Sequence, residues 1–293
     1  MSILTYMINT FSLYILLFRR VFCLVLLIWT SSIALQAQDR CGTVAYNKMI
    51  YSEDISPTKV DRFENWISEK ITQKKSKEEA ATAADKQKKE NATLVEIPVV
   101  VHIIHNNEPI GTGLNIPDAQ ILSQIDVLNE DFRRQNADRV NTPASFVDVA
   151  ADIQVEFVMA RRDPEGLATN AILRVAGTKT SWSMSDNSAL KALSYWPSED
   201  YLNIWVTEVS GTLLGFAQFP VSDELDGLEE GSANALTDGV VIDYQVFGSI
   251  DKYPAADLKP NFARGRTATH EIGHFLGLRH IWGDTGSSPV SYT

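Results

Sequence analysis

Residues 270–280, HEIGHFLGLRH, constrain the fold more than any other part of the 293-residue chain. His270 and His274 are four positions apart, so a helix would carry both imidazoles on one face, about one turn apart. On a continuous helix His280 would lie about 9 Å beyond His274 along the axis, too far to share an ion with it. Gly277 can adopt a positive φ angle that ends the helix and turns the chain back. The segment therefore predicts a helix over 265–277, a turn, and three histidines around one metal ion.

The residue types in this segment favour zinc. Imidazole nitrogens bind Zn²⁺ at about 2.0–2.1 Å, and Glu271 can reach a water on the ion without binding the ion itself. The full HExxHxxGxxH pattern is expected by chance in only about one in 10⁵ chains of this length. Histidines on an ordinary amphipathic helix are therefore the weaker interpretation. The two remaining histidines, His102 and His105, face opposite sides of a predicted strand, which predicts a structural role or none.

The region from residue 94 onward predicts an α+β domain, with a mixed β-sheet and two long helices packed on it. A continuous β-branched run at 95–104 is typical of a buried central strand. Apolar residues recur at three- and four-residue steps over 116–136, which predicts a long amphipathic helix. The remaining predicted elements are strands at 153–160, 201–209, 215–220 and 238–247 and a short helix at 187–196.

The first 37 residues predict a secretory signal. Arg19 and Arg20 precede an apolar run, and small residues near Ala37 suit a cleavage site. Residues 1–18 are uncharged, which is unusual ahead of the basic pair; a start codon placed too early and an uncleaved anchor are the alternative explanations. Cleavage would remove Cys23 and leave Cys41 as the single cysteine, which excludes an internal disulfide in the exported chain.

A charged segment follows. Residues 68–93 are almost entirely charged or small, which predicts a solvated helix or a flexible linker that proteases cut easily. A short amphipathic pattern at 58–67 precedes it. Asn91-Ala92-Thr93 is a glycosylation sequon that matters only in a host that glycosylates. The predicted organisation is a signal at 1–37, an N-terminal segment with its linker at 38–93, and a main domain at 94–293.

HEIGHFLGLRH is similar to the metzincin zinc-binding consensus. The surrounding blocks RTATHEIGHFLGLRHIWGD, LNIWV, LLGFAQFP, DGVVIDYQVFG and IPDAQILSQIDVLNEDFRRQN resemble the pappalysin family, which are cytophagalysin-type secreted metalloproteases. The resemblance covers about residues 94–284, and RCGT at 40–43 is a further match. It implies a metzincin-like upper subdomain, in which a twisted mixed β-sheet carries a backing helix and an active-site helix.

By position, the resemblance implies that His270, His274 and His280 bind Zn²⁺ and that Glu271 is the general base. The implied reaction is peptide hydrolysis through a zinc-bound water, whose proton Glu271 takes and then delivers to the leaving amine. An edge strand at Gly215, Phe216 and Ala217 would bind the extended substrate by backbone pairing. The alternative is an ordinary edge strand that ends at Pro220. The sequence does not identify a calcium site.

Cys41 lies ahead of the linker and of the zinc motif. A thiolate is a strong zinc ligand, so this order predicts a cysteine switch, in which Cys41 occupies the position of the catalytic water. Cleavage within 68–93 would then release the cysteine and activate the zymogen. The family resemblance implies the same arrangement, with a CGT near the start of the pro-segment. Lipid attachment and a free surface thiol are the alternatives.

Only thirteen residues follow His280, and all five methionines, at positions 1, 7, 49, 159 and 184, precede the motif. The resemblance implies a lower subdomain with a methionine turn beyond the third histidine, so we expect a truncated chain without it. Two alternatives stay open. One is a zinc-binding protein without useful proteolysis. The other is a secreted binding module in which the three histidines and Cys41 hold a structural zinc.

The net charge of −11 argues against nucleic acid and anionic membranes as partners, because both attract clustered cations. The prediction is a secreted zinc endopeptidase made as a zymogen, with protein or peptide substrates and no stable membrane association after signal removal. No oligomeric state is predicted.

Overall fold

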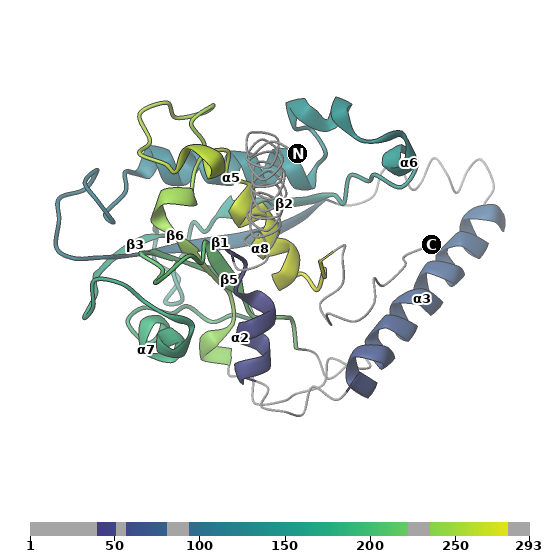
Figure 1. The fold of residues 1–293 in the computed structure, drawn as a ribbon, viewed down its shortest axis with the longest axis horizontal. Coiled ribbons are helices and arrows are strands. Elements are labelled where there is room, and N and C mark those ends of the chain that lie inside the picture. Colours follow the sequence, from purple (N-terminus) through teal and green to yellow (C-terminus); the bar gives the residue numbers. More distant parts are fainter. Residues whose placement is uncertain (1–39, 51–56, 81–93, 222–234, 281–293) are drawn as a thin grey trace, which may run out of the picture. The chain divides into compact units, whose positions relative to one another are not determined.

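The computed structural model describes residues 40–50, 57–80, 94–221 and 235–280 (Figure 1). Contacts group residues 41–293 into one unit, and residues 1–40 form another. The predicted signal, the sequon and the residues after His280 lie outside the described ranges. Among the helices of the described residues, none is long and apolar enough to cross a membrane.

A six-stranded sheet forms the centre of the unit that begins at Cys41 (Figure 1). The strand order is β2-β1-β4-β6-β5, and β3 also pairs with β1. All pairs are parallel except β5 with β6. The strands are β1 (Val95–His105), β2 (Val155–Met159), β3 (Ile172–Ala176), β4 (Leu202–Thr207), β5 (Gly215–Ala217) and β6 (Val240–Asp243).

The long strand β1 organises the sheet. Its first half pairs with β2 and its second half pairs with β3, while β4 lies along its other side. Six consecutive residues of β1, 99–104, are buried, because both faces of the strand are covered. This confirms the central strand that the β-branched run predicted. The antiparallel strand β5 ends the sheet at the opposite edge from β2.

The helices are α2 (Thr43–Ile50), α3 (Pro57–Ala80), α5 (Asp118–Phe132), α6 (Ala144–Val147), α7 (Asn187–Lys191) and α8 (Arg266–Phe275). Short 3-10 turns lie at η2 (Ala137–Asn141), η3 (Met184–Asp186), η4 (Ala235–Thr237), η5 (Tyr244–Val246) and η6 (Pro260–Phe262). The predicted elements are confirmed, most of them with shorter ends, whereas α2, α6 and β3 were not predicted. The described part of the charged segment is helical, with exposed side chains over 68–77.

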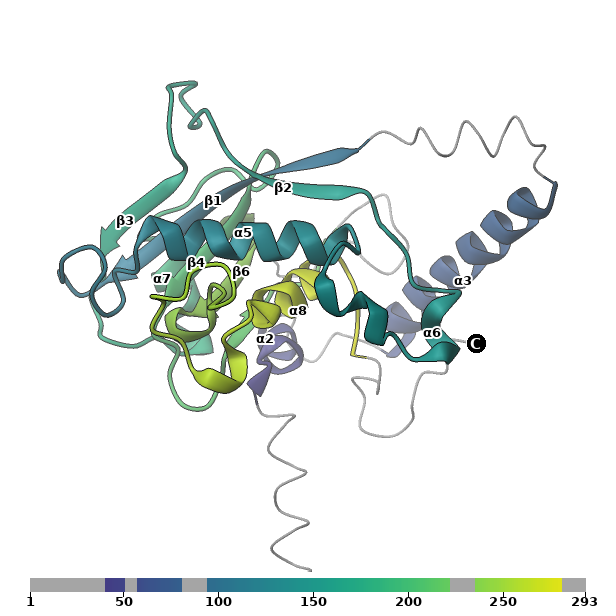
Figure 2. The same cartoon turned by 90° about the horizontal axis from the view of Figure 1, so that it is seen from above.

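Helices α5 and α8 cover one face of the sheet, which we call the α5 face (Figure 2). Ile121, Ile125 and Leu128 of α5 are buried there against strands β1 and β4 and against Ile272 of α8. The buried polar side chains of α5, Gln120, Ser123 and Gln124, hydrogen-bond to backbone beside this apolar cluster. Burial of a periodic apolar stripe on a sheet explains why α5 and α8 are held at a fixed position.

The opposite face, which we call the α7 face, combines aromatic and polar side chains. Trp182, Trp205 and Phe216 form its apolar cluster with Leu190 of α7. His102 is buried there, stacked on Trp205, with Ser194 and Asn203 at its two ring nitrogens. Burial lowers the pKa of His102 to about 4, so the ring is neutral at ordinary pH. The predicted structural role of this histidine is confirmed.

Candidate metal centre

Helix α8 ends where the sequence predicts. Gly277 has a φ angle of +91°, and the amides of Gly277 and Leu278 donate to the carbonyls of His274 and Gly273. These two hydrogen bonds form a Schellman motif, which ends a helix and reverses the chain. An L-residue at the left-handed position would be strained, so the glycine is needed here. The turn brings His280 back beside the two histidines of the helix.

The three histidine Nε2 atoms converge. They lie 3.0 Å apart for His270 and His274, 3.1 Å apart for His274 and His280, and 3.2 Å apart for His270 and His280. Ligands of a tetrahedral zinc at about 2.0–2.1 Å would be about 3.3 Å apart, so the spacing fits this ion. Cys41 completes the cluster, with all four ligand atoms within 4.8 Å of one another.

The environment of His274 prepares it to bind a metal. Its Nδ1 lies 2.7 Å from the carbonyl oxygen of Leu278, which can only accept a hydrogen bond. Nδ1 therefore carries the proton, and the lone pair of Nε2 is left for the ion. Because Leu278 belongs to the same turn as Gly277, one backbone reversal both places His280 and orients His274.

Glu271 lies beside the cluster and is almost completely buried. Its Oε2 accepts a hydrogen bond of 2.6 Å from the Thr43 hydroxyl and lies 3.6 Å from the Cys41 sulfur. Burial raises the pKa of Glu271 to about 7, although the Thr43 and Cys41 hydrogen bonds and His280 act in the opposite direction. A carboxyl group with a pKa near neutrality can both accept and donate a proton.

Gly215 of β5 lies directly against Glu271. A Cβ atom at this position would be 2.8 Å from the Val241 carbonyl oxygen and 3.1 Å from the Cγ of Glu271. The glycine therefore lets the edge strand approach the carboxylate of α8. The sequence predicted a substrate-binding role for this strand, and the structure shows Glu271 and β6 as the neighbours that require the glycine.

The thiol of Cys41 is held at the same place. Burial and the Glu271 carboxylate raise its pKa well above the ordinary value. A metal cation beside the sulfur would act in the opposite direction and favour the thiolate. Residues 41–43 thus place a sulfur at the histidine cluster and a hydroxyl on the neighbouring carboxylate.

The segment Cys41–Ile50 occupies the outer edge of β5. The Gly42 amide donates to the Gly215 carbonyl at 2.9 Å, and the Ala217 amide donates to the Thr43 hydroxyl at 2.8 Å. The Asn47 carboxamide donates to the Ala217 carbonyl and accepts from the Phe219 amide, both at 2.9 Å. The segment therefore holds four backbone groups of the edge, three of them through side chains.

Sequence reasoning missed Thr43 and Asn47. Thr43 lies in the RCGT block, which singled out only its cysteine, and its partner Glu271 is 228 positions away. Asn47 had no signal, because a side-chain amide that replaces backbone pairing follows no periodic pattern. By contrast, the structure brings together all four predicted residues, Cys41 and the three histidines.

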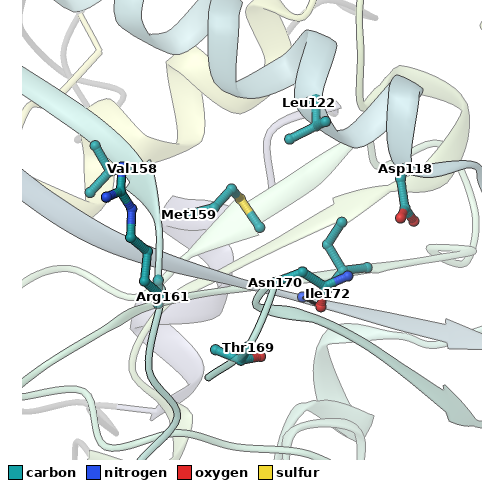
Figure 3. Close-up of a pocket in the computed structure, with 9 residues that line it drawn as sticks. Asp118, Leu122, Val158, Met159, Arg161, Thr169, Asn170 and Ile172 are labelled. Carbon is teal, nitrogen blue, oxygen red and sulfur yellow. Dashed lines mark hydrogen bonds between the residues drawn. The ribbon is translucent and has the colours of Figure 1, made fainter. Parts of the chain in front are cut away.

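A separate depression lies at the other end of the sheet, between the start of α5, β2 and β3 (Figure 3). It has a volume of about 460 Å³ and includes Asp118, Met159, Arg161 and Ile172 in its lining. No histidine or cysteine lines it. The four potential metal ligands, Cys41 and the three histidines of the cluster, instead lie at the β5 edge.

A helix carrying HExxHxxGxxH, a third histidine returned by a turn, and a buried glutamate beside the cluster define a metalloprotease-type centre. No protein-family profile matches the chain. Extracellular metalloproteases of Colletotrichum graminicola and Verticillium alfalfae are 25% and 30% identical over 73% and 66% of this chain. The chain spans only 62% and 55% of the length of these two relatives.

Two solved structures extend the comparison. Mature mirolysin of Tannerella forsythia in complex with a cleaved peptide is 46% identical, with a TM-score of 0.58, over 67% of this chain and 68% of that chain. A promirolysin variant from the same organism is 38% identical, with a TM-score of 0.63, over 85% of this chain and 73% of that one. The chain belongs to the metalloprotease family that includes mirolysin, and its α+β fold is metzincin-like.

Proposed function

We propose that this protein is a secreted zinc endopeptidase of the pappalysin type, made as a zymogen that Cys41 keeps inactive. The observation that carries the proposal is the convergence of three Nε2 atoms and the Cys41 sulfur beside a buried glutamate. Secretion is supported by the predicted signal and by the similarity to extracellular metalloproteases. The two mirolysin structures support a peptide substrate and a latent precursor.

His270, His274 and His280 would hold the zinc. When bound, zinc supplies Lewis acidity, which lowers the pKa of water and stabilises developing negative charge on oxygen. The Leu278 carbonyl keeps His274 in the tautomer that leaves Nε2 free to bind. The rigid turn at Gly277 holds the third ligand without a bulky side chain at the left-handed position.

Glu271 moves the proton. In the latent protein its Oε2 is bound by the Thr43 hydroxyl and faces the Cys41 thiol. Once residues 41–43 leave, this oxygen is free to accept a proton from the attacking water and to return it to the leaving amine.

The outer edge of β5 would bind the substrate. Gly215, Ala217 and Phe219 present the backbone groups that the N-terminal segment now occupies. An extended peptide can pair with the same groups and so lie across the histidine cluster. The segment itself becomes helical at Thr43, so it covers the edge without presenting an extended peptide to Glu271.

Removal of the proton-transfer group tests the catalytic assignment. The linker of the purified protein is cut by limited proteolysis, and zinc content and casein cleavage are measured for wild type and Glu271→Gln. We expect one zinc in both proteins and a loss of activity of about 10²–10⁴-fold in the variant, the usual contribution of a positioned acid–base group. Comparable activity in the two proteins would remove Glu271 from the mechanism.

The latency assignment needs its own test on uncut protein. Cys41→Ala should show casein cleavage before any linker cut, whereas wild type should not. Met49→Ala, at an exposed position of the same segment, is the matched control and should stay latent. An uncut Cys41→Ala protein as silent as wild type would contradict the switch. Zinc that stays fully bound with no activity after cutting would favour the structural-zinc alternative.

A further inference from the structure

Tyr46 is the most deeply inserted side chain of the segment that covers β5. It is fully buried, its ring lies 4.9 Å from the Phe216 ring, and it joins the aromatic cluster of the α7 face. The phenol oxygen accepts a hydrogen bond of 2.5 Å from the Asn187 carboxamide. Burial raises the pKa of Tyr46 to about 12, while hydrogen bonds from Thr237 and Asn187 act the other way. The phenol is therefore neutral and bound at its polar end.

The walls around this ring come from the main domain. They are Phe216 of β5, Asn187, Leu190 and Lys191 of α7, and Thr237 of η4. These walls are tied to one another without Tyr46. Lys191 donates to the Thr237 carbonyl at 2.5 Å, and the Thr237 hydroxyl donates to Gln218 at 2.8 Å. The pocket is thus held by the main domain and does not depend on the side chain that fills it.

The polar end of the pocket is specific for a hydroxyl-bearing ring. Asn187 is 3% exposed, and its Oδ1 has no hydrogen-bond partner among the described residues. The side-chain amide nitrogen of Asn187 donates its hydrogen bond to the phenol oxygen of Tyr46. The Lys191 amine lies 4.6 Å from the Trp205 ring centroid and 5.8 Å from the Tyr46 ring centroid, so it borders both rings.

The pocket opens beside the strand that is proposed to bind substrate. Phe216 points to the α7 face, whereas Ala217 packs in the cluster of the α5 face. Alternate side chains of a peptide that pairs with this edge also point to opposite faces of the sheet. Every second side chain of such a peptide would therefore lie on the same side of the sheet as Tyr46.

We propose that this pocket is a substrate subsite of the activated protease and that it selects a tyrosine side chain of the bound peptide. The inference rests on the proposed function, because it assigns specificity to the edge that the N-terminal segment leaves. Tyr46 then acts as a built-in occupant of the subsite, in addition to the thiol at the metal centre.

A tyrosine scan of one cleaved peptide tests the subsite. A casein-derived peptide that the linker-cut protein cleaves is resynthesised with Tyr, Phe or Ala at each position in turn, and kcat/KM is measured. At one position we expect Tyr to exceed Ala more than about ten-fold, from burial of the ring. Tyr should exceed Phe about three- to ten-fold, the usual range for one hydrogen bond.

Asn187→Ala should bring the Tyr-to-Phe ratio at that position to about one. Ser188→Ala, an exposed neighbour on α7, is the matched control and should keep the wild-type ratio. If no position distinguishes Tyr from Ala, or if Asn187→Ala keeps the Tyr-to-Phe ratio, the subsite is wrong.

A binding measurement separates this inference from the proposed function. A peptide of residues 40–50 with Cys41→Ala is titrated into the linker-cut protein from which the segment has been removed. Tyr46 should bind more tightly than Tyr46→Phe, and Tyr46→Phe more tightly than Tyr46→Ala. This order would support the pocket even if no peptide is hydrolysed, whereas equal affinities would overturn it while leaving peptide cleavage unaffected.

Discussion

The two faces of the sheet are completed in different ways. The apolar cluster of the α5 face comes entirely from residues of the main domain, and the buried polar residues beside it belong to α5. The α7 face buries His102, Lys191 and Asn187. Its apolar cluster includes Tyr46, which comes from the N-terminal segment. The first face is therefore independent of the segment, whereas the second changes when the segment leaves. We therefore expect α8 to stay in position on the sheet when the N-terminal segment leaves the β5 edge.

The largest stability effect is expected on the α5 face. Leu128→Ala removes a fully buried side chain of α5, which should lower the free energy of unfolding by about 2–5 kcal/mol. Urea unfolding of intact and linker-cut protein measures the change. We expect the same loss in both forms, because the segment does not contribute to this cluster. A loss that depends on the cut would contradict the independence of the face.

An intermediate effect is expected from His102 on the α7 face. Its pKa is about 4 when folded and about 6.5 when unfolded, so below pH 6.5 the unfolded chain binds a proton that the folded chain does not. Stability should fall between pH 6.5 and 4 by about 3 kcal/mol from this group. Lys191 adds no slope there, because its pKa, lowered by burial to about 7, leaves it protonated in both states.

His102→Gln isolates this contribution. Unfolding curves of the variant and of wild type are compared from pH 7 to pH 4, and their difference cancels the titration of groups common to both. We expect the difference to shift in favour of the variant as the pH falls. A difference that is independent of pH would show that His102 is not buried as a neutral ring.

The smallest effect is expected from the hydroxyl of Tyr46. Tyr46→Phe leaves the Asn187 amide without its partner, which should destabilise the intact protein by about 1 kcal/mol. The effect should vanish once the linker is cut and the segment is removed. Thermal unfolding of the intact and the linker-cut protein measures this effect. An equal effect before and after the cut would mean that Tyr46 does not leave the pocket.

Much of the α5 face could be predicted from the sequence. The apolar repeat of α5, the β-branched run of β1 and the glycine that ends α8 are local patterns, and each was found where expected. The short elements α2 and β3 were missed, because α2 is fixed by its contacts with β5 and β3 by its pairing with β1. Periodicity cannot reveal an element whose conformation depends on a distant partner.

The candidate site also has a part that the sequence predicted and a part that it did not. The histidines and Glu271 lie within eleven residues, so helix geometry together with the turn at Gly277 predicts their convergence. The contacts of Thr43 with Glu271 and of Tyr46 with Asn187 join residues 228 and 141 positions apart. Such pairs follow from the tertiary fold, which sequence spacing does not encode.

X-ray absorption at the zinc edge tests the central claim most directly, because it counts sulfur and nitrogen ligands before and after the linker is cut. The proposed switch predicts three nitrogen ligands and one sulfur at about 2.3 Å in intact protein. After the cut, the sulfur should be replaced by oxygen as casein cleavage begins. A sulfur that remains bound in cut protein, or that is absent from intact protein, would contradict a zinc site gated by Cys41.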